Sequence, residues 1–312
     1  MTRVAVLAGG RSPEREVSLH SGHRVASALR TRGHDVVLLD PSDAPFVETI
    51  SAADVSVCFI ALHGKEGEDG TVQRLLELLE LPYTGTRPGP CERAFDKVLA
   101  KEALDAAQIP TPAWAAVQLA ALRDLAAGPI LHRIVGRLGL PLVVKPSRAG
   151  SAMGLSFIER EADLPRAVMN ALSFSEAAIV ERRIHGPEVA AGIVWGIDAL
   201  PLVEIVAKDG VFDYAARYTA GTTEYFAPAR VAPEVAEACR REAVRAFEEL
   251  DLRDVARLDL MVDAEGRPWV VDVNSSPGMT DTSLLPMAAQ VAGIGFEELC
   301  ERVLQLALDR PA

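Results

Sequence analysis

Positive charge, cysteine and aromatic residues are all scarce in this sequence of 312 residues. The formal net charge of −12 argues against a non-specific nucleic-acid binder, which normally presents a basic surface. The four cysteines, Cys58, Cys91, Cys239 and Cys300, show neither metal-type spacing nor a disulfide framework. We therefore expect a reduced, acidic protein, in which local Lys and Arg can still build a phosphate pocket.

Long hydrophobic runs are also absent. No window approaches the roughly 18 uninterrupted apolar residues of a membrane span. The start, MTRVAVLAGG, lacks the apolar core and cleavage site of a signal peptide. The phosphate-loop pattern G-x-x-x-x-G-K-[ST] and the dinucleotide pattern G-x-G-x-x-G are absent too. We expect a cytoplasmic protein with small-molecule substrates, and neither a membrane nor a nucleic acid as partner.

Strand and helix patterns alternate through the first third of the chain. Strands are expected at residues 4–8, 35–39 and 55–62, and helices at residues 15–31 and 71–81. Apolar strands separated by helices predict a doubly wound parallel sheet. The Gly- and Pro-rich stretch TGTRPGP that follows predicts a domain junction.

The rest of the chain mixes helices with further strands, some of them antiparallel. Residues 211–229 show no clean period and predict a long loop, which is often functional in a compact domain. The other expected elements are helices at residues 96–107, 131–138, 233–250 and 296–308, and strands at 141–145, 155–159, 178–183, 189–195 and 200–207.

The segment 257–280, RLDLMVDAEGRPWVVDVNSSPGMT, is the most informative of the chain. It predicts two strands joined by a turn. With AEGR as the loop, Asp259 lies across from Asp272 and Arg257 across from Asn274. Because strand side chains alternate, these four residues share one face.

Two carboxylates facing each other in a sheet repel unless a cation lies between them. Val271 and Val273 are expected on the opposite, apolar face of the second strand. Mg²⁺ would resolve the repulsion, because it takes one or two carboxylates and leaves its other positions to water and phosphate. A solvated hairpin face is the alternative, but an Arg, two Asp and an Asn on one face favour a site.

A loop of small residues, KPSRAGSAMG at 145–154, joins two expected strands. A lysine at the strand end, followed by backbone N–H groups that an anion can approach, suits a polyphosphate. A plain hairpin loop explains the pattern equally well. Glu181 and Glu188, which lie near the ends of neighbouring segments, would by themselves be solvated side chains.

Two further loops follow expected strands, at the edge where parallel sheets bind ligands. Residues 9–14, GGRSPE, bring Glu14 to the start of a helix. There either the helix dipole or a ligand ammonium would favour its carboxylate. Residues 61–70, ALHGKEGEDG, place His63 beside glycines, although a single His is more often a structural hydrogen-bonding residue.

Taken together, these segments resemble the D-alanine–D-alanine ligases of the ATP-grasp superfamily over nearly the whole chain. The matching segments, in chain order, are AGGRSPEREVSL (8–19), ALHGKEGEDG (61–70), YTG (83–85), DK (96–97), KPSRAGS (145–151), GPE (186–188), RYTAGTTEYFAP (217–228), RLD (257–259) and NSSPGMTDTSLLPM (274–287).

The resemblance implies an α/β fold with α+β elements and three domains. An N-terminal α/β substrate domain would cover residues 1–86, and a central ATP-grasp subdomain residues 87–183. A C-terminal subdomain, residues 184–312, would carry a lid at about residues 206–228. ATP would lie between the central and C-terminal subdomains, both of α+β type.

The implied activity is ATP-dependent ligation of two D-alanine molecules through an acylphosphate, for peptidoglycan precursor synthesis. The implied cofactors are ATP and two Mg²⁺ ions, with Mn²⁺ as a substitute and room for a monovalent cation. A homodimer is implied as well. An acylphosphate hydrolyses in water, so the lid would have to close over the site.

The resemblance also assigns roles to individual residues. Glu14 would bind the first ammonium and, with Ser151 and Tyr218, close a loop over the site, while His63 would lie near the second substrate. The other implied groups are the ATP-binding residues Lys97, Lys145, Glu181, Glu188 and Arg217; the metal ligands Asp259, Asp272 and Asn274; the oxyanion donors Arg257 and Gly278; and Ser283 and Leu284 for the second carboxylate.

The sequence departs from the family pattern at several positions. Asp272 stands where Glu is usual, Arg217 where Lys is usual, and Ala152-Met153 where Ser-Val is usual. Two alternatives therefore stay open. One is a related ligase with another second substrate, such as D-lactate, D-serine or a specialised-metabolite amine, although Tyr218 fits dipeptide formation. The other is a nucleotide-binding paralogue with impaired catalysis.

Overall fold

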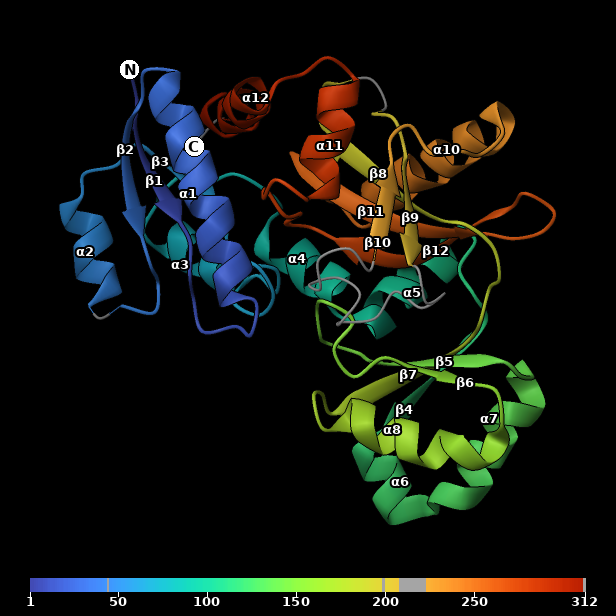
Figure 1. Cartoon of the computed structure of the whole chain (residues 1–312). Coiled ribbons are helices and arrows are strands. Elements are labelled where there is room, and N and C mark those ends of the chain that lie inside the picture. Colours follow the sequence, from blue (N-terminus) through green and yellow to red (C-terminus); the bar gives the residue numbers. More distant parts are fainter. Residues whose placement is uncertain (44, 198–199, 208–222, 311–312) are drawn as a thin grey trace.

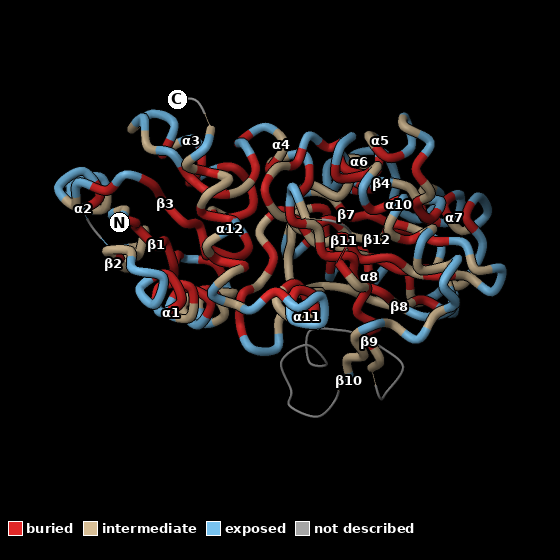
Figure 2. Tube along the Cα trace, turned by 90° about the horizontal axis from the view of Figure 1, so that it is seen from above, coloured by how far each residue is buried: buried red, intermediate tan, exposed pale blue. Residues whose placement is uncertain are grey.

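The computed structural model describes the chain except for residues 44, 198–199, 208–222 and 311–312. The described strands form three sheets, one of three, one of four and one of five strands (Figure 1). None of the described helices is long and apolar enough to cross a membrane. Buried residues concentrate in the strands, and exposed residues follow the outer helices and loops (Figure 2).

The N-terminal sheet is parallel, with the order β2-β1-β3, as the sequence predicts. Val4 and Val6 of β1 face α1 and α12, whereas Ala5 and Leu7 face α2 and α3, because side chains alternate along a strand. Its elements are β1 (Arg3–Leu7), α1 (Arg15–Thr31), β2 (Asp35–Leu39), α2 (Phe46–Ala52), β3 (Val57–Ile60), α3 (Thr71–Leu78) and the chain's last helix, α12 (Phe296–Leu308).

The central sheet is antiparallel, with the order β4-β7-β5-β6. One face packs against α6, α7 and α8 through residues such as Leu142 and Val144. The opposite face carries Val143 and Lys145 and is left open for a ligand. The elements are β4 (Trp114–Gln118), α6 (Leu119–Leu125), α7 (Ala127–Leu138), β5 (Leu142–Pro146), β6 (Ser156–Ile158), the 3-10 turn Glu161–Asp163, α8 (Leu164–Leu172) and β7 (Ala177–Arg182).

The C-terminal sheet is also antiparallel, with the order β10-β9-β8-β11-β12. Leu258 and Leu260 of β11 pack with α4, α5 and α10 on one face, and α11 covers part of the other. The elements are α4 (Pro88–Phe95), α5 (Lys97–Ala106), β8 (Glu188–Val194), β9 (Val203–Ala207), β10 (Thr223–Phe226), α10 (Pro233–Glu249), β11 (Val255–Val262), β12 (Pro268–Asn274) and α11 (Leu284–Val291).

One expectation about the elements was wrong. Residues 223–226, expected within a loop, form β10 and pair with β9. The stretch TGTRPGP leads into a helix that was not predicted, since α4 begins at Pro88, and proline suits the first helical position. The domain junction expected there stays a prediction. The short elements β4, α2, α6, α8 and α11 were not predicted. Much of the predicted lid lies outside the described residues, and the domain boundaries at 86 and 183 stay predictions.

Candidate functional site

A bulge in β12 shapes the acidic hairpin. Asp259 pairs with Asp272 and Arg257 with Asn274, as predicted, but the register shifts between Asp259 and Leu260. The extra residue is Val271, which lines the same cavity as Asp272 instead of pointing to the opposite face. The predicted position of Val271 was therefore wrong, because strict alternation fails at a bulge.

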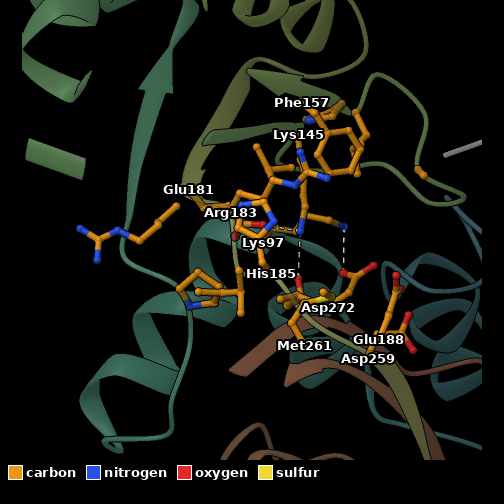
Figure 3. Close-up of a pocket in the computed structure, with 18 of the residues that line it drawn as sticks. Lys97, Lys145, Phe157, Glu181, Arg183, His185, Glu188, Asp259, Met261 and Asp272 are labelled. Atoms are coloured by element: carbon orange, nitrogen blue, oxygen red, sulfur yellow. Dashed lines mark hydrogen bonds and ion pairs between the residues drawn. The ribbon is translucent and has the colours of Figure 1, made fainter. Parts of the chain in front are cut away.

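The open face of the central sheet and the hairpin enclose a cavity of about 320 Å³. Apolar walls come from Val143, Leu155, Phe157 and Met261, and Figure 3 shows charged side chains converging between them. The charged residues that line it include Lys97, Lys145, Glu181, Glu188, Asp259 and Asp272.

Two lysines reach this cavity from different elements. Lys97, the first residue of α5, places its Nζ 3.1 Å from Asp272 Oδ1 and donates to the Ala149 carbonyl at 3.1 Å. Lys145 of β5 lies 2.5 Å from Glu181 Oε1, and its Nζ donates to the Val271 carbonyl at 3.3 Å. Burial would lower the pKa of Lys145, but the carboxylates of Glu181 and Asp272 outweigh it and raise that pKa.

Arg257 and Asp259 form a buried pair with two parallel hydrogen bonds. Arg257 Nε donates to Asp259 Oδ1 at 2.8 Å, and Nη2 donates to Oδ2 at 2.9 Å. The side chain of Asp259 is 3% exposed and that of Arg257 12%. Burial alone would lower the pKa of Arg257, but Asp259 and Asp272 raise it. The guanidinium therefore stays charged and fixed in orientation.

A second cavity, of about 140 Å³, adjoins the first and shares Lys97, Ala149 and Asp272 with it. The other residues of interest on its wall are Glu14, His63, Glu68, Ser151, Arg257, Asn274, Gly278, Ser283 and Leu284. Glu14 directly precedes α1, and its Oε1 accepts a hydrogen bond from Ser151 Oγ. Among the residues that the structure describes, its Oε2 is buried and has no hydrogen-bond partner. A buried carboxylate oxygen in this state is poised for a cationic ligand.

Glycines make room for that carboxylate. A Cβ atom on Gly150 would lie 2.5 Å from Glu14 Oε2, and one on Gly64 would lie 2.3 Å from it. The two loops that the sequence singled out thus close on Glu14 from opposite sides. Gly64 also has a φ of +70°, which side chains other than glycine rarely adopt.

Both ring nitrogens of His63 are engaged by protein groups. Nδ1 lies 3.1 Å from the Ser276 carbonyl, which can only accept, so Nδ1 carries the proton. Nε2, 2.9 Å from Ser21 Oγ, then accepts from that hydroxyl. Burial lowers the pKa of His63 to about 4. His63 is a neutral residue that holds the turn after β12, in agreement with its structural alternative, although it also lines the second cavity.

The start of α11 offers an anion site. Ser283 stands directly before the helix, and its Oγ makes no capping bond to it but accepts from the Thr280 backbone N–H at 2.9 Å. Leu284 is the first helical residue, so its N–H has no partner within the helix. A Cβ on Gly278 would lie 2.6 Å from Ser283 Oγ, which explains why glycine stands at this position.

The donor atoms of the hairpin suit a hard cation that is bound together with a ligand. Asp259, Asp272 and Asn274 offer only oxygen donors, and Asn274 Oδ1 already accepts from the Ser276 N–H at 2.9 Å. Within the part of the chain that the structure describes, no cluster of three or more His, Cys, Asp or Glu could hold a metal ion. The oxygen atoms of Asp259, Asp272 and Asn274 fit Mg²⁺, which takes one or two carboxylates and shares substrate phosphates.

Family models match most of the chain. One, described as the N-terminus of D-ala D-ala ligase, matches residues 40–86, and one described as its C-terminus matches residues 103–305. A D-alanine–D-alanine ligase from Pelotomaculum thermopropionicum is 41% identical over 309 residues, which cover 98% of this chain and 97% of that relative. The chain belongs to the D-alanine–D-alanine ligase family.

Solved structures of ligases share the fold. The D-alanine–D-alanine ligase from Bacillus anthracis, complexed with ATP, matches with a TM-score of 0.84 at 28% identity and covers 99% of this chain and 98% of that one. The VanG D-Ala:D-Ser ligase from Enterococcus faecalis matches with a TM-score of 0.83 at 26% identity, covering 98% and 99%. The three-sheet architecture is therefore that of an ATP-grasp ligase, as the sequence predicts, and the family is one of ATP-dependent ligases.

In this ligase, each site residue that the sequence predicted and the structure describes lines one of the two cavities. Arg217 and Tyr218 lie outside the described residues. Several charged residues at or beside the cavities were missed, including Arg182 and Arg183 of the first cavity wall and the two buried residues Glu68 and Lys101. Glu68, 8% exposed, accepts from the Gly64 N–H at 3.0 Å, and burial, then the charge of Glu14, raises its pKa to about 8. Lys101, 4% exposed, pairs with Glu181. Its one sequence signal is the spacing of four residues from Lys97 on α5.

Proposed function

We propose that the protein joins two D-alanine molecules into D-alanyl-D-alanine while ATP is converted to ADP and phosphate, in the synthesis of peptidoglycan precursors. The observation that carries this function is the pair of adjoining cavities that share Lys97 and Asp272. The larger has the size and charge pattern for a nucleotide. The smaller combines the Glu14 carboxylate, whose Oε2 has no hydrogen-bond partner among the described residues, an arginine and a helix start, which together suit amino acids.

The larger cavity supports binding of ATP. Lys97 and Lys145 would contact the phosphates and the adenine, and Glu181 and Glu188 the adenine amine and the ribose hydroxyls. Carboxylate oxygens have several lone pairs, so Glu181 can accept from adenine besides its lysine partners. The Bacillus anthracis relative, whose structure contains ATP, supports this assignment.

In the smaller cavity, Glu14 Oε2 would receive the ammonium of the first D-alanine, with Ser151 and Tyr218 beside it. That substrate's carboxylate attacks the γ-phosphorus, the bond to the β-phosphate oxygen breaks and ADP leaves, and the carboxylate becomes an acylphosphate. Ser283 Oγ and the Leu284 N–H would hold the carboxylate of the second D-alanine near His63. Its amine then attacks the acyl carbon, and phosphate leaves from the tetrahedral intermediate.

Arg257 would act where negative charge develops on the acyl oxygen, together with the Gly278 N–H. Its two bonds to Asp259 fix the guanidinium in advance, so no reorganisation is needed as the oxyanion forms. Asp259, Asp272 and Asn274 would hold two Mg²⁺ ions, which neutralise charge on the transferring phosphoryl group. Mn²⁺ as a substitute, and a monovalent cation, belong to the same proposal.

A phosphate-release assay tests the function. Release should require ATP, Mg²⁺ and D-alanine together, and mass spectrometry should find D-alanyl-D-alanine as the product. D-lactate and D-serine serve as competing acceptors, because the D-Ala:D-Ser relative shows that the fold alone does not select the second substrate. Phosphate release that does not depend on D-alanine would overturn the proposal.

The homodimer and the cytoplasmic location are also proposals, supported by membership of the family. Light scattering coupled to size-exclusion chromatography would measure the mass of the particle. A mass of one 33.4 kDa chain at assay concentrations would contradict the dimer.

A further inference from the structure

Lys101 does not line the nucleotide cavity but contacts a residue that does. It lies one turn after Lys97 on α5, so both side chains leave the same side of that helix. Lys101 is 4% exposed, and its Nζ lies 2.8 Å from Glu181 Oε2. It also donates to Thr111 Oγ1 at 2.6 Å, and this hydroxyl donates to the Val270 carbonyl at 2.8 Å.

Glu181 thus lies between two lysines. Lys145 lies 2.5 Å from Oε1 and Lys101 2.8 Å from Oε2, and the Glu181 side chain is 2% exposed. Burial alone would raise the pKa of Glu181, but the two lysines outweigh it and lower the pKa. If one lysine is removed, the other lysine alone must offset the negative charge of this buried carboxylate.

Lys145 is the cation that would have to carry that charge. The Nζ of Lys145 already contacts both Glu181 Oε1 and the carbonyl oxygen of Val271, the extra residue of the bulge in β12. Without Lys101, the unshared carboxylate would draw Lys145 toward itself and away from a nucleotide. The two lysines of α5 therefore pair with different carboxylates of the cavity wall, Lys97 with Asp272 and Lys101 with Glu181.

We propose that Lys101 is a positioning residue for the nucleotide: it holds the Glu181 carboxylate and shares its charge, so that Lys145 keeps its place facing the cavity. This inference rests on the ligase function proposed above. Lys101 lines neither cavity and reaches the nucleotide cavity only through Glu181, so its effect is expected on nucleotide binding and not on the bond-forming steps.

The Lys101→Met variant tests this, because methionine nearly preserves length while removing the charge. We expect the KM for ATP to rise about tenfold or more, while the kcat at saturating ATP and the KM for D-alanine stay within about threefold. Calorimetric titration with ADP should show the same loss of affinity. Thr111→Val is the matched control: it removes hydrogen bonds from the same network without a charge, so it should lower the melting temperature and leave the KM for ATP unchanged.

A double-mutant cycle separates positioning from general damage. Glu181→Gln removes the charge that Lys101 shares, so adding Lys101→Met to it should weaken ADP binding little further, and the effects should not add. Additive effects, or a Lys101→Met variant with wild-type ADP affinity, would overturn the inference. If Lys101→Met does not fold, Lys101→Gln keeps a donor without the charge and is measured in the same cycle.

The ADP titration also distinguishes this inference from the proposed function. A wild-type protein that binds ADP but releases no phosphate with D-alanine would refute the ligase function alone. In that case, unequal ADP affinities of the wild type and Lys101→Met would still support the role of Lys101.

Discussion

Among individual residues, Asp272 is one that the sequence predicts to differ from the family pattern. It faces Asp259 across the hairpin and pairs with Lys97 at 3.1 Å, so a metal there must share it with a cation. Asp272→Glu adds one methylene and extends the carboxylate further into the cavity. We expect the variant to keep its turnover while the Mg²⁺ concentration for half-maximal phosphate release falls several-fold.

Titrations with Mg²⁺ and Mn²⁺ check that expectation. Asp263→Glu, on the turn of the same hairpin, is the control, because Asp263 bonds Arg267 and Trp269 and lines neither cavity. Loss of turnover in Asp272→Glu at every metal concentration, with Asp263→Glu unaffected, would contradict the assignment of Asp272 to the metal.

Glu68 and His63 change the free energy of unfolding with pH in opposite directions. The pKa of Glu68 is raised from 4.5 to about 8, so folding takes up a proton in that window and stability falls as the pH rises through it. The pKa of His63 is lowered from 6.5 to about 4, so its contribution to stability rises with pH between those values. Between pH 6.5 and pH 8, only the Glu68 effect remains.

Glu68→Gln should remove this remaining effect. We expect the free energy of unfolding of the wild type, relative to the variant, to fall by roughly 1.5 kcal/mol between pH 6.5 and pH 8. Urea titrations at the two pH values measure it. Glu265→Gln, on the exposed hairpin turn, should show no such change, and an equal change in both variants would assign the effect to the protein's overall charge.

At the scale of elements, the loop between β5 and β6 meets the start of α1 at Glu14. Gly150→Ala would bring a Cβ to 2.5 Å from Glu14 Oε2 and displace the carboxylate. The KM for D-alanine should rise at least about tenfold, because the proposed ammonium partner moves. The KM for ATP should change little.

Gly136→Ala in α7 is the matched control, since a Cβ there has no atom within 4 Å. Alanine favours the helix, so this variant should gain about 0.5–1 kcal/mol of stability with unchanged kinetics. An unchanged KM for D-alanine in Gly150→Ala would mean that Glu14 does not bind the substrate.

The elements that the sequence predicts best are those with a long or clean period. The bounds of α1, β2 and α12 agree with the predicted ones. Elements of four to nine residues, such as β10 and α8, carry too few residues for a period to emerge. The pairing of Asp259 with Asp272 was right, but the bulge beside it depends on contacts that no local pattern encodes.

At the scale of the whole molecule, the predicted site residues come from segments that lie far apart in the chain. Glu14, Ser151 and Gly278 nevertheless line one cavity, and their roles stay predictions. Lys101 and Glu68 could not be found in this way, because what marks them is burial beside a particular partner. Such contacts exist only after the sheets have packed together.

Arg310, near the end of the described chain, contacts residues next to both the N-terminal and the C-terminal sheet. After α12, Arg310 binds the Asp254 carboxylate, whose side chain is 5% exposed, and the Tyr83 carbonyl. The other oxygen of Asp254 accepts from the Gly85 N–H at 2.6 Å. The contact between the two sheets therefore includes the buried Asp254 carboxylate, whose charge Arg310 offsets.

Arg310→Met should lower the free energy of unfolding by about 2 kcal/mol, because it leaves a charged, buried acceptor without its donor. Arg302→Met is the matched control within α12: its partner Glu298 is 39% exposed, and an exposed pair contributes less than about 0.5 kcal/mol. Urea unfolding followed by circular dichroism compares the two. If both variants lose the same stability, the Arg310 contact does not hold the two sheets together.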